Sequence, residues 1–193
     1  MHALFFEMRP KPGHLEHYFT HVDRLRPLLA RHEGLRWLQR FRAMDDPDLI
    51  LSHQHWADED AILGWRRDPE HRRSQEAGRR VHFVDYRIRV GPEVDARDDA
   101  PSGDRPLVVA VLAAAPTTPD ASPGAAATGT APIGRAFESM TDPGTMLNLI
   151  DADGPAHARA LVAAARDLPG LRAVHVFAVS RDYGLTDRAA APQ

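Results

Sequence analysis

Two stretches of this chain decide its fold: RFRAMDDPDLIL at Arg40–Leu51 and AFESMTDPGTML at Ala136–Leu147. Each is typical of a β-hairpin, because apolar residues flank a turn that contains an Asp-Pro pair. The two align without a gap at an offset of 96 residues, and five aligned positions carry the same residue. These positions are Phe41 and Phe137, Met44 and Met140, Asp46 and Asp142, Pro47 and Pro143, and Leu51 and Leu147. Five identities in a single register predict that the chain contains one unit twice.

The first hairpin lies within one complete unit. Apolar residues at spacings of three and four predict a helix over Leu15–Leu29, which Pro27 should kink or shorten and Gly34 should stop. A second helical region is expected to begin at Asp58, a good N-cap, and to end at Gly78. The expected strands are Ala3–Met8, Leu35–Met44, Leu49–Trp56 and Val81–Val90. The resulting order, β-α-β-β-α-β, is that of the ferredoxin-like fold.

The second half repeats this order less completely, after an acidic linker at residues 92–105. Prolines and glycines interrupt Ala115–Pro132, where the first unit has its long helix, so no regular helix is expected there. The expected strands are Leu107–Ala114, Arg135–Thr141, Thr145–Ile150 and Leu171–Ser180, and the expected helix is Pro155–Leu168. The chain therefore divides into a ferredoxin-like domain at 1–91, a degenerate repeat at 106–183 and a tail at 184–193.

The predicted fold class is α+β. The two tandem ferredoxin-like units are expected to pack their sheets together as an intrachain pseudo-dimer, the arrangement that a single unit would reach by dimerising. The expected oligomeric state is a monomer with this internal pseudo-dimer, or a homodimer.

The composition excludes several classes of site and partner. The chain has no cysteine, which excludes disulfide scaffolds, Cys-based zinc sites, iron–sulfur clusters and Cys nucleophiles. A formal net charge of −3 gives no argument for nucleic-acid binding. The N-terminus has no signal-like pattern, and the longest apolar run, Leu107–Ala115, is far shorter than the roughly 18 residues that span a bilayer. A cytoplasmic protein without a membrane partner is expected.

An ordered set of residues in the first unit resembles the antibiotic biosynthesis monooxygenase family. The set comprises the opening MRPKPG, Glu33-Gly34-Leu35, Trp56 with its acidic cap, Trp65, Pro69-Glu70-His71, Gln75 and Gly78-Arg79. The resemblance covers residues 1–91, and reaches 106–183 only through the repeat. It implies a ferredoxin-like unit that pairs into a dimeric α+β barrel, with a pocket between its sheet and its helices.

The resemblance also implies a function. Some members are cofactor-free oxygenases that convert aromatic polyketides to quinones, so the chain is expected to be a monooxygenase-like tailoring protein that acts on an aromatic polyketide or a similar polycyclic molecule. In that branch a Trp at the end of the third strand lines the pocket, and Trp56 matches it. The Asn and Tyr of the same branch are replaced here by Ser52 and Ile62. No cofactor is expected, and the expected partner is a small hydrophobic aromatic molecule.

Two alternatives stay open. Another branch of the family binds and degrades haem, and Trp65 matches its Trp, while Phe6 and Gln75 stand where that branch has Asn and His. The chain would then be a haem-binding or haem-modifying protein. The other alternative is a non-catalytic member of the same fold that carries a ligand or takes part in an assembly.

The candidate site lies in the first unit. We expect His71 and Trp56 to be the catalytic residues, with His71 as a base or hydrogen-bond donor. The expected substrate-binding residues are Trp65, Ser52, Gln75 and Phe41. Alternation along the second strand places Leu35, Trp37 and Phe41 on one face. The second unit has Ala152 where the first has Trp56, so it is expected to act only as a packing partner.

Three other clusters of histidine or arginine residues are expected to have structural roles. His53 and His55 point to the sheet face opposite Trp56, and no third His or acid is tied to them in sequence, so no metal site is expected. His14, His17 and His21 flank the apolar stripe of the first helix and are expected to form a solvated boundary. The arginines between Arg66 and Arg80 are interpreted as a wet helix surface, or as a group that holds the carboxylate of an acidic ligand at the pocket mouth.

Overall fold

The computed structural model describes residues 1–97, 105–115 and 134–192. The N-terminal half contains β1 (His2–Pro10), α1 (Leu15–Leu29), β2 (Leu35–Ala43), β3 (Ile50–Trp56), α2 (Glu59–Arg67), α3 (Pro69–Ala77), the π-helical turn η1 (Gly78–His82) and β4 (Phe83–Pro92). The C-terminal half contains β5 (Leu107–Ala114), β6 (Arg135–Ser139), β7 (Thr145–Ala152), α4 (Pro155–Arg166), β8 (Leu171–Ala178) and β9 (Arg181–Gly184). The stretch Ala115–Pro132, predicted to lack a regular helix, lies outside the described residues except for Ala115.

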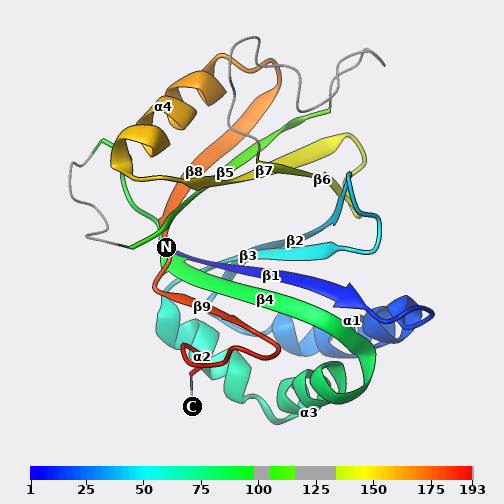
Figure 1. Cartoon of the computed structure of the whole chain (residues 1–193). Helices are drawn as coiled ribbons and strands as arrows, with labels where there is room; N and C mark the ends of the chain where they lie inside the picture. Colours follow the sequence, from blue (N-terminus) through cyan, green and yellow to red (C-terminus); the bar gives the residue numbers. More distant parts are fainter. Residues whose placement is uncertain (98–104, 116–133, 193) are drawn as a thin grey trace.

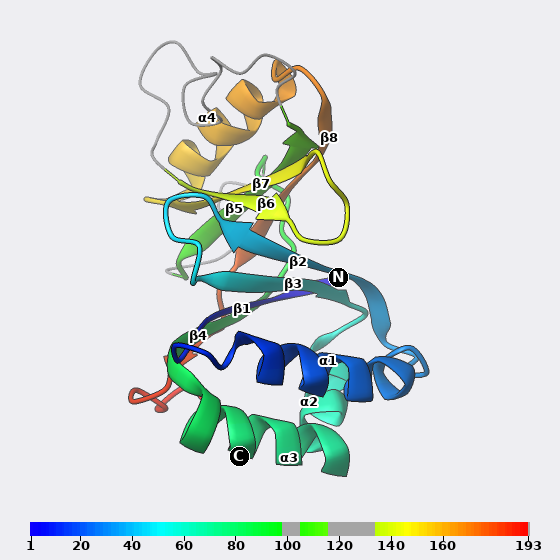
Figure 2. The ribbon, with the colours of Figure 1, turned by 90° about the vertical axis from the view of Figure 1, so that its right-hand side faces the viewer.

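Both halves have the strand order of a ferredoxin-like sheet. The N-terminal sheet runs β2-β3-β1-β4 and the C-terminal sheet runs β6-β7-β5-β8, with every paired strand antiparallel. The two sheets face each other, and the helices cover their outer faces, α1 to α3 on one side and α4 on the other (Figure 1, Figure 2). The predicted α+β class and the tandem ferredoxin-like arrangement are therefore confirmed.

One seam between the halves joins β2 to β6. Arg42 pairs directly with Glu138, its counterpart at the offset of 96 residues. On either side of this pair, the backbone N–H of Met44 donates to Ala136 O at 3.0 Å, and that of Met140 donates to Arg40 O at 2.9 Å. Met140 and Ala136 are the counterparts of Met44 and Arg40. Each half thus presents the same backbone positions to the other, as two subunits do across a two-fold axis.

A second seam joins the ends of β4 and β8. The Val94 N–H donates to Val176 O at 2.9 Å, and the Ser180 N–H donates to Val90 O at 2.8 Å. A Cβ at Gly91 would lie 2.0 Å from the Ala178 carbonyl oxygen, so this close approach requires glycine. The two seams close the two sheets into a barrel.

The barrel interior is filled by an apolar core. Its largest fully buried side chains are the phenyl rings of Phe5, Phe41, Phe137 and Phe177, each at most 1% exposed. Fully burying a large apolar side chain stabilises a fold by roughly 1.5–3 kcal/mol. The matched aromatic residues of the two hairpins, Phe41 and Phe137, therefore both contribute to the core that holds the halves together.

One charged side chain is also buried at this interface. Arg89 is 4% exposed, and its guanidinium donates to Glu7 at 2.8 Å and to Asp151 of the other half at 2.5 Å. A buried cation is tolerated because it has two anionic partners.

The helix boundaries confirm one expectation and correct two. Asp58 caps α2, and its Oδ1 accepts from the Ala61 N–H at 2.8 Å. Gly78 ends α3, but the chain stays helical through η1 as far as His82, so β4 begins at Phe83. Gly34 does not stop α1, which ends at Leu29 and includes Pro27. A Cβ on Gly34 would lie 2.2 Å from the Cβ of Ala61, so the glycine lets β2 pass close to α2.

Two strand features differ from the prediction. The register of β2 shifts between Leu35 and Trp37, so Leu35 packs in the cluster of Trp56 under the helices, while Trp37 packs in the barrel core. Such a bulge places one extra residue in the strand and reverses the alternation. The strand β9 was not expected, and it pairs with β4 at the outer edge of the N-terminal sheet. In the part of the chain that the structure describes, no helix is long and apolar enough to cross a membrane.

The seams and the barrel core predict that the two halves stay together without a covalent link. We expect that cleavage at a protease site introduced between residues 98 and 104 leaves two fragments that co-elute on native gel filtration. Two separately eluting fragments that both remain folded would contradict this arrangement.

The cluster under the helices gives a second prediction. Trp56 is 0% exposed and packs with Ile62, Trp65 and Val90. Trp56→Ala should lower the free energy of unfolding by about 3–5 kcal/mol, measured by urea denaturation. As a control, Val84→Ala at a 50% exposed position should change it by less than about 0.5 kcal/mol. Equal effects of the two substitutions would show that Trp56 does not support the helix layer.

Candidate functional site

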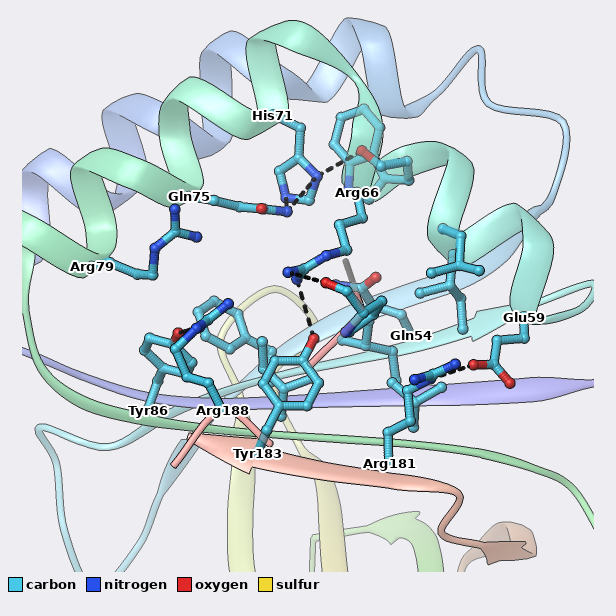
Figure 3. Close-up of a pocket in the computed structure, with 18 of the residues that line it drawn as sticks. Gln54, Glu59, Arg66, His71, Gln75, Arg79, Tyr86, Arg181, Tyr183 and Arg188 are labelled. Carbon is cyan, nitrogen blue, oxygen red and sulfur yellow. Dashed lines mark hydrogen bonds and ion pairs between the residues drawn. The ribbon is translucent and has the colours of Figure 1, made fainter. Parts of the chain in front are cut away.

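A cavity of the N-terminal half lies between its sheet and its helices, in two adjacent compartments. The larger encloses about 430 Å³ beneath α1 and α3. The smaller encloses about 100 Å³ beneath α2 and α3, and β9 and the residues that follow it close it from below (Figure 3). Six residues line both compartments: Phe6, Gln54, Trp65, His71, Gln75 and Phe83.

The start of α3 fixes the position of His71. The Asp68 carboxylate accepts from the backbone N–H groups of Glu70 and His71, both at 2.9 Å, and Pro69 occupies the first turn. This cap sets the helix so that His71 and Gln75, four residues apart, lie on the same face. Figure 3 shows both side chains, with Arg79 one turn further on, directed from the helix into the cavity.

His71 is held as a neutral base. Its ring stacks on Trp65 with centroids 4.3 Å apart, and its Nδ1 lies 2.8 Å from the Trp65 carbonyl oxygen, so Nδ1 carries the proton and donates. Nε2 then keeps its lone pair, and the amide nitrogen of Gln75 lies beside the ring, 3.3 Å from Nδ1 and 3.5 Å from Nε2. Burial lowers the pKa of His71 to about 4, although the Trp65 carbonyl and Asp68 oppose the shift. At neutral pH the imidazole can therefore accept a hydrogen bond or a proton.

A second polar group faces the cavity from β3. Gln54 is 9% exposed, and its amide nitrogen donates to Ser52 Oγ at 3.1 Å. Its carbonyl oxygen accepts from Trp56 Nε1 at 3.0 Å, which fixes the orientation of the amide. The sequence analysis omitted Gln54, although the alternation that separates Trp56 from His53 and His55 also places residue 54 on the Trp56 face.

The structure brings together four of the six predicted site residues. His71, Trp65, Gln75 and Ser52 line the cavity. Trp56 lies behind Gln54, fully buried, and reaches the cavity only through its hydrogen bond to that residue. The prediction for Phe41 is wrong, because this side chain points into the barrel core on the opposite face of the sheet. Side chains alternate along a strand, and Phe41 directly follows Arg40, which lines the cavity together with Leu38.

The C-terminal residues contribute a wall that the sequence did not predict. Arg181 Nε donates to Glu59 at 2.5 Å, and Arg188 donates to the Tyr86 hydroxyl at 2.6 Å. From the helix side, Arg66 donates to the hydroxyl of Tyr183 at 3.3 Å and to the carbonyl oxygen of Pro192 at 3.0 Å. These contacts fasten the end of the chain over the smaller compartment.

The remaining histidines lie outside this cavity or at its rim. His53 and His55 face the barrel interior as predicted, and there they meet His175, which contacts Glu93 at 2.6 Å. Burial lowers the pKa of His53 well below its ordinary value and that of His55 to about 4, so both are neutral. Among the described residues, no group of three or more His, Asp or Glu is arranged to hold a metal ion.

The cavity residues do not match the haem-binding branch. Gln75, an amide, stands at the position where that branch has its His, and Phe6 stands where it has Asn. Haem iron is held in proteins by His, Cys, Met or Tyr, so the amide of Gln75 does not supply that axial ligand.

Comparisons with known proteins agree on the N-terminal half. Residues 1–77 match the family model "Antibiotic biosynthesis monooxygenase". The jasmonate monooxygenase ABM of Pyricularia oryzae is 38% identical over 91 residues, which are 47% of this chain and 42% of that protein. The match therefore spans less than half the length of the curated relative.

Solved structures resemble the whole chain at low sequence identity. An aldoxime dehydratase superposes with a TM-score of 0.53 and 13% identity over 99% of this chain and 88% of that one. An anthrone oxidase-like protein gives a TM-score of 0.39 and 13% identity over 100% of this chain and 96% of that one. The first likeness shows that the two-sheet fold occurs elsewhere in a single chain. The family match covers residues 1–77, less than half of the chain, so the similarity to the antibiotic biosynthesis monooxygenase family is a similarity of the N-terminal half alone.

Proposed function

We propose that this protein is a cofactor-independent monooxygenase that oxidises an aromatic polyketide or a similar polycyclic molecule in the N-terminal cavity. The observation that carries the proposal is the neutral, half-buried imidazole of His71 at the junction of the two compartments. The family match and the name of the curated relative, a jasmonate monooxygenase, support oxidation of a small molecule as the reaction type.

The walls of the cavity suit a flat apolar substrate. Phe6, Phe83 and Val22 supply apolar surface from β1, β4 and α1, and a cavity of about 430 Å³ is within the size range of small-molecule sites. The polar groups His71, Gln54 and Gln75 lie at the junction, and further polar side chains, among them His21, Arg40 and His82, line the larger compartment. An apolar cavity with a small number of placed polar groups orients a ligand and exposes one part of it to chemistry.

The proposed reaction uses His71 as the base and dioxygen as the oxidant. His71 Nε2 removes a proton from a substrate CH₂ whose carbanion is conjugated with a carbonyl group through an aromatic ring, and an amide N–H of Gln54 or Gln75 stabilises the negative charge on that carbonyl oxygen. The carbanion then transfers its electrons to O₂ and forms a C–O bond. Both C–H bonds are broken, one oxygen atom becomes the new carbonyl, and the other leaves as water.

Removal of the base should slow the reaction without emptying the cavity. With a hydroxylated anthrone as substrate, His71→Ala should lower the rate of oxygen uptake by roughly 10²–10⁴-fold, the usual contribution of a general base. His157→Ala, a change of a half-buried histidine in the other half, should leave the rate unaltered. A wild-type protein that binds the anthrone and consumes no oxygen would be a ligand carrier, and the proposed activity would be wrong.

The pKa of His71 predicts the pH dependence. Because the neutral imidazole is the active form and burial lowers its pKa to about 4, kcat/KM should rise with pH through about 4 and be level above that. The measurement is a pH–rate profile for oxygen uptake with a substrate that does not titrate in this range. An inflection near 6.5, the ordinary value for histidine, would show that His71 is not desolvated during turnover.

A further inference from the structure

The smaller compartment contains an excess of positive charge. Four arginines line it, namely Arg66, Arg79, Arg181 and Arg188, and the only carboxylate in its wall is that of Glu59. Glu59 is committed to Arg181, to which it is joined by an ion pair at 2.5 Å. Arg66, Arg79 and Arg188 therefore face the compartment without an anionic partner among the described residues.

Two of these three arginines have a structural role. Arg66 and Arg188 hold the C-terminal residues in place through Tyr183, Tyr86 and the Pro192 carbonyl. Even so, a guanidinium has five N–H donors, and these contacts use two on Arg66 and one on Arg188. Their remaining donors can be offered to a ligand.

Arg79 has no such role. It is half-buried and lines the compartment, and within the described residues no acceptor or carboxylate contacts its guanidinium. Its neighbour Arg80 is different, because its side chain is 76% exposed and pairs with Glu76 at 3.1 Å. Partial burial of an unpaired cation is unfavourable, so an anionic group that entered the compartment would be bound favourably.

We infer that the ligand of this cavity carries a carboxylate, which binds Arg79 and Arg66 in the smaller compartment. A guanidinium matches the planar, two-oxygen geometry of a carboxylate, and a space of about 100 Å³ holds a small group but no second ring system. The inference rests on the proposed function for the position of the reacting carbon, and it narrows the substrate to an apolar acid.

This placement orients the whole molecule. Arg79 follows Gln75 by one turn, and Gln75 and His71 stand at the junction of the compartments. With its carboxylate at Arg79, the apolar body of the ligand extends past His71 into the larger compartment. The carbon that reacts is then the one that lies at the junction, beside His71 Nε2.

The test compares two ligands that differ only in charge, anthraquinone-2-carboxylate and its methyl ester. Binding is measured by calorimetry on the full chain. We expect the wild type to bind the acid at least tenfold more tightly than the ester, and Arg79→Gln to reduce that preference roughly tenfold. Arg79→Lys should keep part of it, because a lysine offers the charge without the planar fork. Arg80→Gln is the matched control and should leave the preference unchanged.

The inference is overturned if the ester binds as tightly as the acid, if neither binds, or if Arg79→Gln leaves the preference intact. Haem also carries carboxylates. If adding haemin changes the absorption spectrum of the wild type but not that of Arg79→Gln, the arginines bind the carboxylates of haem, and the inference is overturned as well. Oxygen uptake separates the two proposals. If acid and ester substrates are bound and oxidised equally well, only the carboxylate inference is wrong. If binding depends on Arg79 but no substrate causes oxygen uptake, only the proposed monooxygenase activity is wrong.

Discussion

Backbone hydrogen bonds between the two halves are the constraint on which the rest of the structure depends. A lone ferredoxin-like sheet has two open edges and an uncovered inner face. Here the paired bonds of Met44 with Ala136 and of Met140 with Arg40 close one edge, and those of Val94 and Ser180 close the other. The inner faces become the barrel core, so only the outer faces remain to carry helices.

This closure decides where a ligand can bind. The barrel interior is filled by phenyl rings and by the ion pairs of Arg89 with Glu7 and Asp151, and burial keeps His53 and His55 neutral. A cavity therefore forms between the outer face of a sheet and its helices, where packing is looser. In the N-terminal half three helical segments enclose that space, and an Asp68 cap directs His71 into it.

Local patterns were sufficient to predict most of the helices and strands and four residues of the cavity wall, His71, Trp65, Gln75 and Ser52. The spacing of apolar residues and the turn residues predicted the hairpins and helices. The spacing of four residues between His71 and Gln75 predicted that both lie on one helix face and hence in the same site. Phe41 and Leu35 were misassigned because a bulge at the start of β2 changes which residues face the helices, and a bulge leaves no mark in a short alternating stretch. The wall formed by Tyr183 and Arg188 was missed because its partners lie about a hundred residues away in the chain.

The position of that wall follows from the two-fold arrangement. In each half the chain leaves its last strand and crosses onto the other half: Val94 and Ala96 pack against the cluster beneath α4, and Arg181 to Gly184 pair with β4. The first crossing, at Glu93 to Arg97, lines a pocket beside α4 in the other half. The second lines the smaller compartment of the N-terminal half, with described residues as far as Pro192. The cavity of the N-terminal half is thus completed by the end of the chain, and the C-terminal half contributes to the site through this segment as well as through the barrel.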